Sequence, residues 1–379
     1  MDKNKILFIG CGQAGNNALN EILKLDTKYN GLFVNTSMTD IMPLIKNETN
    51  PTNQAVLGQN VFVIPNADGS GKNRTKAKQY AKQYVSSILA ELEKYPLQEN
   101  IYVVFSMGGG TGSGLAPTLS SMIRMRFPKK SVHLIAIKPK LKENKRVIEN
   151  AIECWNDLTK AYVNEKMSFH TISFLDNDKR DNELEVNKEW AKSLNSALSL
   201  SAPHVRGTID TADSTTLMTE AKGYQVIYNL DEQLKDTVKN AITYAMNDSV
   251  YFEPISNKCV YLGISTKPET FDHYAISDAF DVRESTFEGY NDKENILVIS
   301  GATLPKLMAE MLKESLDEKN KQTNSIFDEE EDLSIAIDVD SNQKVKSTIV
   351  QPKTEEQNLV KSDEEVKELF NDEFWDDIF

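Results

Sequence analysis

The sequence contains 379 residues, 40% of them hydrophobic, which is enough for two domains with a substantial core. No apolar run reaches the ~18–20 residues that a membrane span needs, and the N-terminus lacks the long apolar region of a signal peptide. The three cysteines are dispersed, so we expect neither a disulfide framework nor protein metal ligands, and a reducing cytoplasm fits.

The net charge of −14 is concentrated near the C-terminus, because residues 321–379 contain 17 acidic and 6 basic residues. The rest of the chain is almost neutral. Nucleic-acid phosphates would repel such a tail, whereas a basic protein partner would be attracted to it.

The first half of the chain alternates short apolar runs with helical patterns. The runs resemble strands buried on both faces, and the alternation predicts a doubly wound parallel sheet. The predicted strands are residues 6–9, 32–35, 61–64, 101–106, 132–137 and 171–175, and the predicted helices are 17–25, 77–94, 115–125 and 147–162.

The second half predicts a smaller α/β domain. A helix over about 187–200 and a turn-rich segment, 201–214, lead into it. Its predicted strands are 225–230, 258–264, 280–284 and 296–300, and its predicted helices are 232–246 and 305–316. We therefore expect a first domain over 1–186, a connecting segment over 187–214 and a second domain over 215–319.

The C-terminal region divides into two parts. Residues 320–361 are polar and acidic, which predicts a disordered linker. Residues 362–379 begin with a capping-box pattern and then place apolar side chains on one face of a helix. These side chains are Val366, Leu369, Phe370, Phe374, Trp375, Ile378 and Phe379. This helix either docks on its own body or folds into a groove of a partner, and the long acidic tether favours the partner.

The first chemical motif is Gly10-Cys11-Gly12-Gln13-Ala14-Gly15, between a predicted strand and a predicted helix. Glycines let backbone N–H groups approach phosphate, and the helix N-terminus attracts an anion. A dinucleotide-binding dehydrogenase uses the same pattern, but it needs an acid near the end of the second strand. That position reads Val34-Asn35-Thr36-Ser37 here.

The second motif is more specific. Gly108-Gly109-Gly110-Thr111-Gly112-Ser113-Gly114 follows a buried strand and opens a helix, so it can wrap around phosphate oxygens. A flexible linker would not lie between these two elements.

This run resembles the signature loop of the tubulin/FtsZ superfamily of GTP-binding, GTP-hydrolysing filament proteins. The resemblance covers roughly residues 5–318 and implies GTP or GDP with Mg²⁺ as ligands. It places nucleotide contacts at Gly10, Cys11, Gly12, Gln13, Asn16, Asn35, Gly69, Gly108, Gly109, Gly110, Thr111, Gly112, Ser113, Gly114, Pro139, Glu143 and Asn177.

In this family Asn177 would read the guanine edge, and residues 66–74 would sense the γ-phosphate and Mg²⁺. The family's base-stacking aromatic and second asparagine are expected on the next helix, where Trp190, Asn187 and Asn195 are the candidates. The family's arginine in the fifth loop falls on Val147, with Arg146 one place early.

The last motif contains Asp210 and Asp213. Read alone, an Asp-x-x-Asp pair in a turn is most often a helix cap. The resemblance implies instead that these acids are catalytic and meet the nucleotide of the neighbouring subunit. Such a head-to-tail contact does not close, so it builds a filament.

With its long acidic tail, the chain most resembles the plasmid- and phage-encoded tubulins that move DNA. The implied partners are the chain itself and a basic DNA-bound adaptor held by Leu369, Phe370, Phe374, Trp375 and Phe379; DNA is contacted indirectly, and no membrane is involved. Three alternatives remain: an FtsZ-like cell-division GTPase, a nicotinamide-dependent dehydrogenase, and a nucleotide-binding scaffold without turnover.

Overall fold

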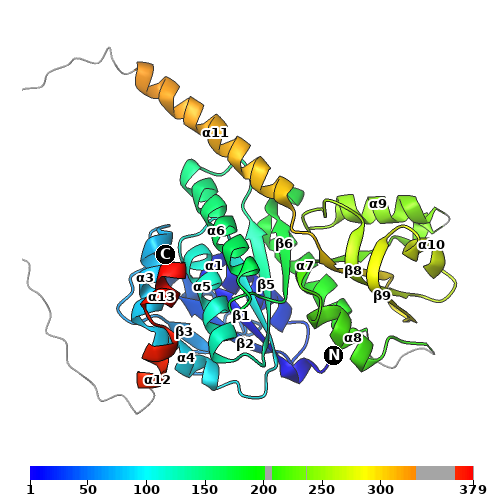
Figure 1. The fold of residues 1–379 in the computed structure, drawn as a ribbon, viewed down its shortest axis with the longest axis horizontal. Coiled ribbons are helices and arrows are strands. Elements are labelled where there is room, and N and C mark those ends of the chain that lie inside the picture. Colours follow the sequence, from blue (N-terminus) through cyan, green and yellow to red (C-terminus); the bar gives the residue numbers. More distant parts are fainter. Residues whose placement is uncertain (201–206, 236, 330–362, 379) are drawn as a thin grey trace, which may run out of the picture.

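The computed structural model describes residues 1–200, 207–235, 237–329 and 363–378 (Figure 1). The strands are β1 Ile6–Cys11, β2 Asn30–Asn35, β3 Val61–Val63, β4 Asn100–Ser106, β5 Ser131–Lys138, β6 Thr171–Asp176, β7 Gly223–Asn229, β8 Lys258–Thr266, β9 Asp281–Tyr290 and β10 Ile296–Ala302. The α-helices are α1 Gly12–Leu23, α2 Met38–Ile41, α3 Arg74–Gln83, α4 Val85–Glu93, α5 Thr111–Arg126, α6 Lys145–Val163, α7 Glu183–Ala197, α8 Thr211–Thr219, α9 Val238–Asp248, α10 His273–Ser277, α11 Lys306–Glu329, α12 Asp363–Leu369 and α13 Asp372–Ile378. Short 3₁₀ turns are η1 Lys3–Lys5, η2 Met42–Leu44, η3 Asn177–Lys179 and η4 Glu232–Leu234.

The ten strands form one sheet in the order β3-β2-β1-β4-β5-β6-β7-β10-β8-β9. The first six strands are all parallel, as predicted, and every residue of β1 is buried. Helix α1 packs against α7, whereas α3, α5, α6 and α11 pack in succession against one another. The order reverses between β1 and β4, and open α/β sheets bind ligands at such a switch point.

The second domain continues the sheet of the first. Two residue pairs, Thr171 with Gly223 and Ile172 with Tyr224, join β6 to β7 in parallel. Strand β10 runs antiparallel to both β7 and β8, and β9 pairs in parallel with β8. The predicted smaller α/β domain is therefore confirmed, although β9 is longer than the predicted 280–284 because its largely exposed, polar residues carry no apolar signal.

Three predicted helices have different bounds. The helix predicted over 77–94 is two helices, because Tyr84 leaves helical geometry at φ −113° and ψ 26°. The helix predicted over 232–246 is η4 followed by α9. The connecting helix, predicted over about 187–200, is α7; it begins earlier because Asn182 caps it by accepting from Leu184 N at 2.9 Å.

Helix α11 corrects the predicted start of the linker. Residue 320 falls inside this helix, which ends at Glu329. Helix α11 contains neither glycine nor proline, and its earlier turns are rich in Leu, Met, Lys and Glu, which favour a helix, so polarity alone misplaced the boundary. The side chains of Ser315 and Lys319 donate to Leu141 O at 2.8 and 3.0 Å, beyond which α11 projects from the body (Figure 1). Residues 330–361 of the predicted linker lie outside the described ranges.

The C-terminal segment forms two helices rather than one, and both lie against the body beside α3 and α4 (Figure 1). Phe370, Phe374 and Trp375 are buried, and Leu369 is partly buried. Ser362 of the capping pattern and Phe379 fall outside the described residues. Among the described helices, none has the length and apolar character needed to cross a membrane.

Candidate functional site

Two glycine loops meet at the switch point of the sheet. Cys11 and Phe105 are paired in register at the ends of β1 and β4, so the following loops are adjacent. Gly12 has φ +71°, and a Cβ there would lie 2.9 Å from the backbone nitrogen of Gly112. A Cβ on Gly112 would lie 2.8 Å from Cys11 O. The two loops are thus packed backbone to backbone, which only glycine permits.

A chain of hydroxyl groups ties three loops together. The hydroxyl of Thr36, after β2, is 2.7 Å from that of Thr111, which opens α5. Thr111 donates to Ser70 Oγ at 3.1 Å, in the loop before α3. Gly69, in the same loop, has φ +71° and donates its N–H to Thr36 O at 2.8 Å. The predicted loop residues Asn35, Gly69 and Thr111 therefore converge on one edge of the sheet.

Within the long glycine run, one position faces open space. A Cβ on Gly110 would lie 2.6 Å from Lys72 Cα, and one on Gly114 would lie 2.6 Å from Arg74 O. A Cβ on Gly109 would meet no atom within 4 Å. Gly109 is therefore the position where the loop has room for a phosphate group.

The loop after β5 packs against the start of the glycine run. A Cβ on Gly108 would lie 3.2 Å from Pro139 Cβ, and the side chain of Val147 also packs beside Gly108. Arg146 instead reaches the loop before α3, where its Nε donates to Lys72 O at 3.4 Å.

Arg74 fastens the glycine run to α6, a role that the sequence analysis did not assign to it. Its buried guanidinium donates to Ser113 Oγ at 3.1 Å and to Ser113 O at 3.0 Å, and it pairs with Glu153 and Asp157. The Ser113 hydroxyl in turn donates to Gly109 O. Ser113, predicted as a nucleotide contact, thus uses its side chain to brace the loop.

A cavity of about 480 Å³ adjoins the first loop. It is lined by Ala14, Asn17, Ile137, Asn177, Asp181, Asn182, Glu183, Leu184 and Asn187. Of the three helix candidates, only Asn187 lies here. Trp190 is buried in the core, and Asn195 accepts from Lys3 and Tyr29 at the other end of α7. No aromatic residue is among the residues that line this cavity, and its apolar lining includes Leu184 and Ile137.

A buried lysine fixes the loop that carries Asn177. Lys138 Nζ, at the end of β5, lies 2.6 Å from both Asp176 Oδ1 and Asp178 Oδ2. Lys138 and Asp176 are paired in register, so the ion network closes the ends of β5 and β6. A buried charge is retained only when it is paired and hydrogen-bonded.

Several buried amides around these loops have one atom without a partner among the described residues. They are Asn16 Oδ1, Asn35 Nδ2, Asn150 Oδ1 and Asn177 Oδ1. Buried polar atoms are almost always hydrogen-bonded, so the partners of these atoms are water or a polar ligand. The set contains acceptors and a donor, which fits a nucleotide.

The other predicted contacts vary in exposure. Gln13 is exposed on the first turn of α1, and Glu143 is half-buried. Cys11 is fully buried, and burial raises the pKa of its thiol well above the usual range, so it contributes backbone rather than a thiolate.

The two predicted catalytic acids lie far from these loops. Asp210 is the N-cap of α8, where its Oδ1 accepts from Asp213 N at 2.8 Å. Helix α7 has 15 residues and so spans about 22 Å, and its far end meets Lys3 through Asn195. The first glycine loop lines a cavity with the first turn of α7, whereas α8, which Asp210 caps, lies near the opposite end of α7 (Figure 1). A single chain therefore does not bring the phosphate loops and the acids together.

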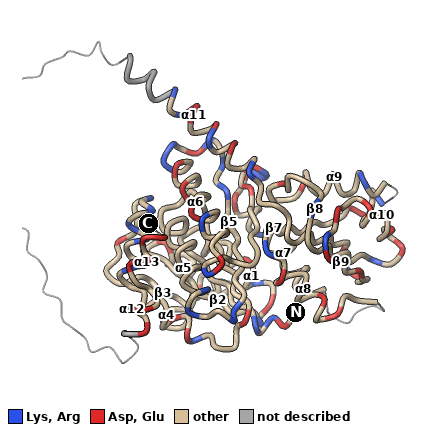
Figure 2. Tube along the Cα trace, viewed as in Figure 1, with Lys and Arg blue, Asp and Glu red and all other residues tan. Residues whose placement is uncertain are grey.

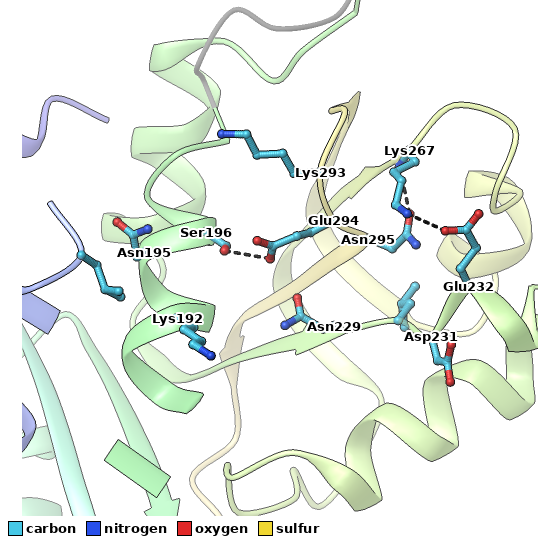
Figure 3. A pocket seen from close by; sticks show the side chains of 12 residues that line it. Lys192, Asn195, Ser196, Asn229, Asp231, Glu232, Lys267, Lys293, Glu294 and Asn295 are labelled. Carbon is cyan, nitrogen blue, oxygen red and sulfur yellow. Dashed lines mark hydrogen bonds and ion pairs between the residues drawn. The ribbon is translucent and has the colours of Figure 1, made fainter. Parts of the chain in front are cut away.

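A second cavity, of about 490 Å³, lies between the far half of α7 and the second domain (Figure 3). Ser196 donates to Glu294 at 2.8 Å, and Lys267 pairs with Glu232 at 2.5 Å. Of the residues described for this lining, Lys267 and Glu232 form the one ion pair, and no residue of the glycine loops lines the cavity.

The fold and site define a doubly wound nucleotide-binding protein whose phosphate loops meet at the switch point of a parallel sheet. Residues 5–179 match the tubulin/FtsZ family GTPase domain, and residues 214–303 match the C-terminal domain of the tubulin-like protein TubZ. The chain is 33% identical over 350 residues to the tubulin-like protein TubZ of Clostridium botulinum C phage, covering 91% of this chain and 93% of that protein. It therefore belongs to the tubulin/FtsZ family and, within it, to the TubZ proteins.

Solved structures agree. A C-terminal tail truncated TubZ of Clostridium botulinum phage c-st superposes with a TM-score of 0.74 at 32% identity, covering 85% of this chain and all (100%) of that one. A GTPγS-form protofilament of Bacillus thuringiensis serovar israelensis TubZ gives a TM-score of 0.72 at 15% identity, covering 86% and 94% respectively. At 15% identity, the similarity to the Bacillus thuringiensis structure shows a shared fold and nothing more.

Proposed function

We propose that this chain is a polymerising GTPase that hydrolyses GTP at a head-to-tail subunit interface and partitions plasmid or phage DNA through a DNA-bound adaptor. One observation carries the proposal: the first glycine loop adjoins the first turn of α7, whereas α8, which carries Asp210 and Asp213 at its start, lies near the opposite end of α7 (Figure 1). Stacking two copies head to tail supplies the missing half of each active site.

In the stacked arrangement, the loops of one subunit hold the phosphates and the acids of the next orient the attacking water. Positioning and charge stabilisation supply most of the catalysis in phosphoryl transfer. Mg²⁺ is usually held by substrate phosphates, waters and one or two protein oxygens. Within the described ranges of the chain, no group of three or more His, Cys, Asp or Glu could hold a metal ion by itself. The phosphates of bound GTP, with waters, would therefore supply most of the ligands of Mg²⁺.

The acidic, aromatic C-terminal segment is the proposed adaptor-binding element. Seventeen acidic residues over 321–379 favour a basic partner, and the buried aromatics supply anchors of the kind that dominate binding energy. The phage origin of the similar TubZ supports a role in moving DNA.

GTP turnover measured against protein concentration, with sedimentation in parallel, tests the shared site. Turnover per molecule should rise above a critical concentration together with pelletable polymer, and GTP should be preferred over ATP. Asp213→Ala should still polymerise with GTP but hydrolyse it slowly, leaving persistent filaments.

The control is Asp272→Ala, because Asp272 is an exposed aspartate that caps a short helix, as Asp210 does at the start of α8. It should keep wild-type turnover. If turnover per molecule is independent of concentration and nothing pellets, the active site is complete within one chain and the proposal is wrong.

A further inference from the structure

The C-terminal segment folds into a compact aromatic hairpin. Asn371 separates α12 from α13 and accepts from Phe374 N at 3.1 Å through its side chain. The indole of Trp375 donates to Phe370 O at 2.9 Å across the break. The ring centroids of Phe370 and Phe374 are 5.0 Å apart, and those of Phe374 and Trp375 are 4.9 Å apart. The break therefore brings the three rings together, which a single straight helix would not do.

These rings are buried against the first domain. Phe370 and Phe374 are each 5% exposed, Trp375 is 3% exposed and Val366 is 7% exposed. They belong to the same hydrophobic cluster as the core of the sheet. The side chains that would bind in a partner's groove are therefore already buried against this chain.

The receiving surface is basic where the segment is acidic. Lys78 of α3 donates to Ile378 O at 2.8 Å, and Lys82 lies 5.7 Å from the Trp375 ring and 3.9 Å from Asp372. Arg126, at the end of α5, lies 3.5 Å from Glu365. Figure 2 shows the acidic positions of α13 on this side of the molecule. Apolar anchors with complementary charges around them are the features of a peptide-binding surface.

This surface also contacts the braces of the phosphate loop. Lys78 lies 2.9 Å from Asp157 of α6, and Asp157 pairs with Arg74, which holds Ser113. A small recess between α3, α5 and α6 is closed by Asp377 and Ile378. The last turn of the segment is therefore linked to the glycine run through a continuous set of hydrogen bonds and ion pairs.

We propose that the face formed by α3, α5 and α6 is a peptide-binding site whose resident ligand is the chain's own acidic, aromatic C-terminal segment. A partner that recognises Phe370, Phe374 and Trp375 must first displace them from this face. Under the proposed function, the competing partner is the DNA-bound adaptor. The proposed binding site for the C-terminal segment does not depend on that function.

The test is binding of a fluorescein-labelled peptide of residues 362–379 to the full chain in GDP, followed by anisotropy. In wild type the resident segment occupies the site, so the peptide should bind weakly. The double variant Phe374→Ala/Trp375→Ala vacates the site, and its apparent Kd for the peptide should be at least ten-fold lower. Adding Lys82→Glu to that variant should raise the Kd several-fold, and a peptide carrying the same two alanines should not bind.

Equal binding to wild type and the double variant, whether weak or tight, would overturn the proposal. Weak binding to both would mean that the body has no such site, and tight binding to both would mean that the resident segment does not occupy it. Sedimentation velocity in GDP distinguishes a segment docked on its own chain from a segment exchanged between two chains. Wild type should be monomeric, and a dimer that the double variant loses would contradict docking within one chain.

Discussion

Replacing Arg74 with alanine tests whether a buried guanidinium holds the phosphate loops in place. Arg74 is 3% exposed and donates to Ser113 Oγ and O at 3.1 and 3.0 Å. It also pairs with Asp157, whose side chain is 23% exposed, and with Glu153, whose side chain is 54% exposed. Removing one partner of a buried pair costs about 3–5 kcal/mol, whereas an exposed pair contributes less than about 1 kcal/mol.

We therefore expect Arg74→Ala to lower the free energy of unfolding by about 3–4 kcal/mol, measured as a lower urea midpoint with an unchanged slope. Arg126→Ala is the control, since its partners Glu93 and Glu365 are 51% and 74% exposed, and it should cost less than about 1 kcal/mol. Equal losses in the two variants would refute the assignment of Arg74 as a buried brace.

Two further predictions concern the base pocket and pH. Asn177→Ala should weaken GTP binding by about 5- to 150-fold, the equivalent of about 1–3 kcal/mol for a lost buried hydrogen bond, and calorimetry should show a smaller preference for GTP over ITP; an unchanged preference would place the guanine edge elsewhere. Burial lowers the pKa of His170 to about 4 and that of His133 well below its usual range, so the unfolded chain binds protons that the folded chain does not. Stability should be constant above about pH 6.5 and fall as the pH drops toward 4, by up to about 1.4 kcal/mol per unit for each histidine, and His170→Asn should flatten that slope in urea titrations at pH 5–6.5.

The parallel sheet and both glycine loops were predictable because they depend on local signals. Continuous apolar runs marked all six strands of the first domain, and five glycines between a strand and a helix left few alternatives. The braces were not predictable in the same way. Arg74 and Lys138 act through partners 38 to 83 residues away, and no local pattern in a single sequence shows such pairs.

The C-terminal segment shows the limit of periodicity. The spacing of its apolar residues identified an amphipathic element but did not say what covers it, and the acidic tether favoured a partner. In the structure the segment covers its own body, because α3 and α5 present basic residues beside an apolar surface. The helix also breaks at Asn371, where a capping side chain competes with continuation of the helix.

Mixing two inactive variants tests the shared active site most directly. Gly109→Asp places a carboxylate where a phosphate would lie, and the open space around Gly109 accommodates the side chain. Asp213→Ala keeps the loops intact and removes an acid at the other end of α7. Each variant alone should turn over GTP slowly, and an equimolar mixture should exceed the sum of the two, because the acids of the first complete the site of the second. A mixture that only equals the sum would contradict hydrolysis between subunits.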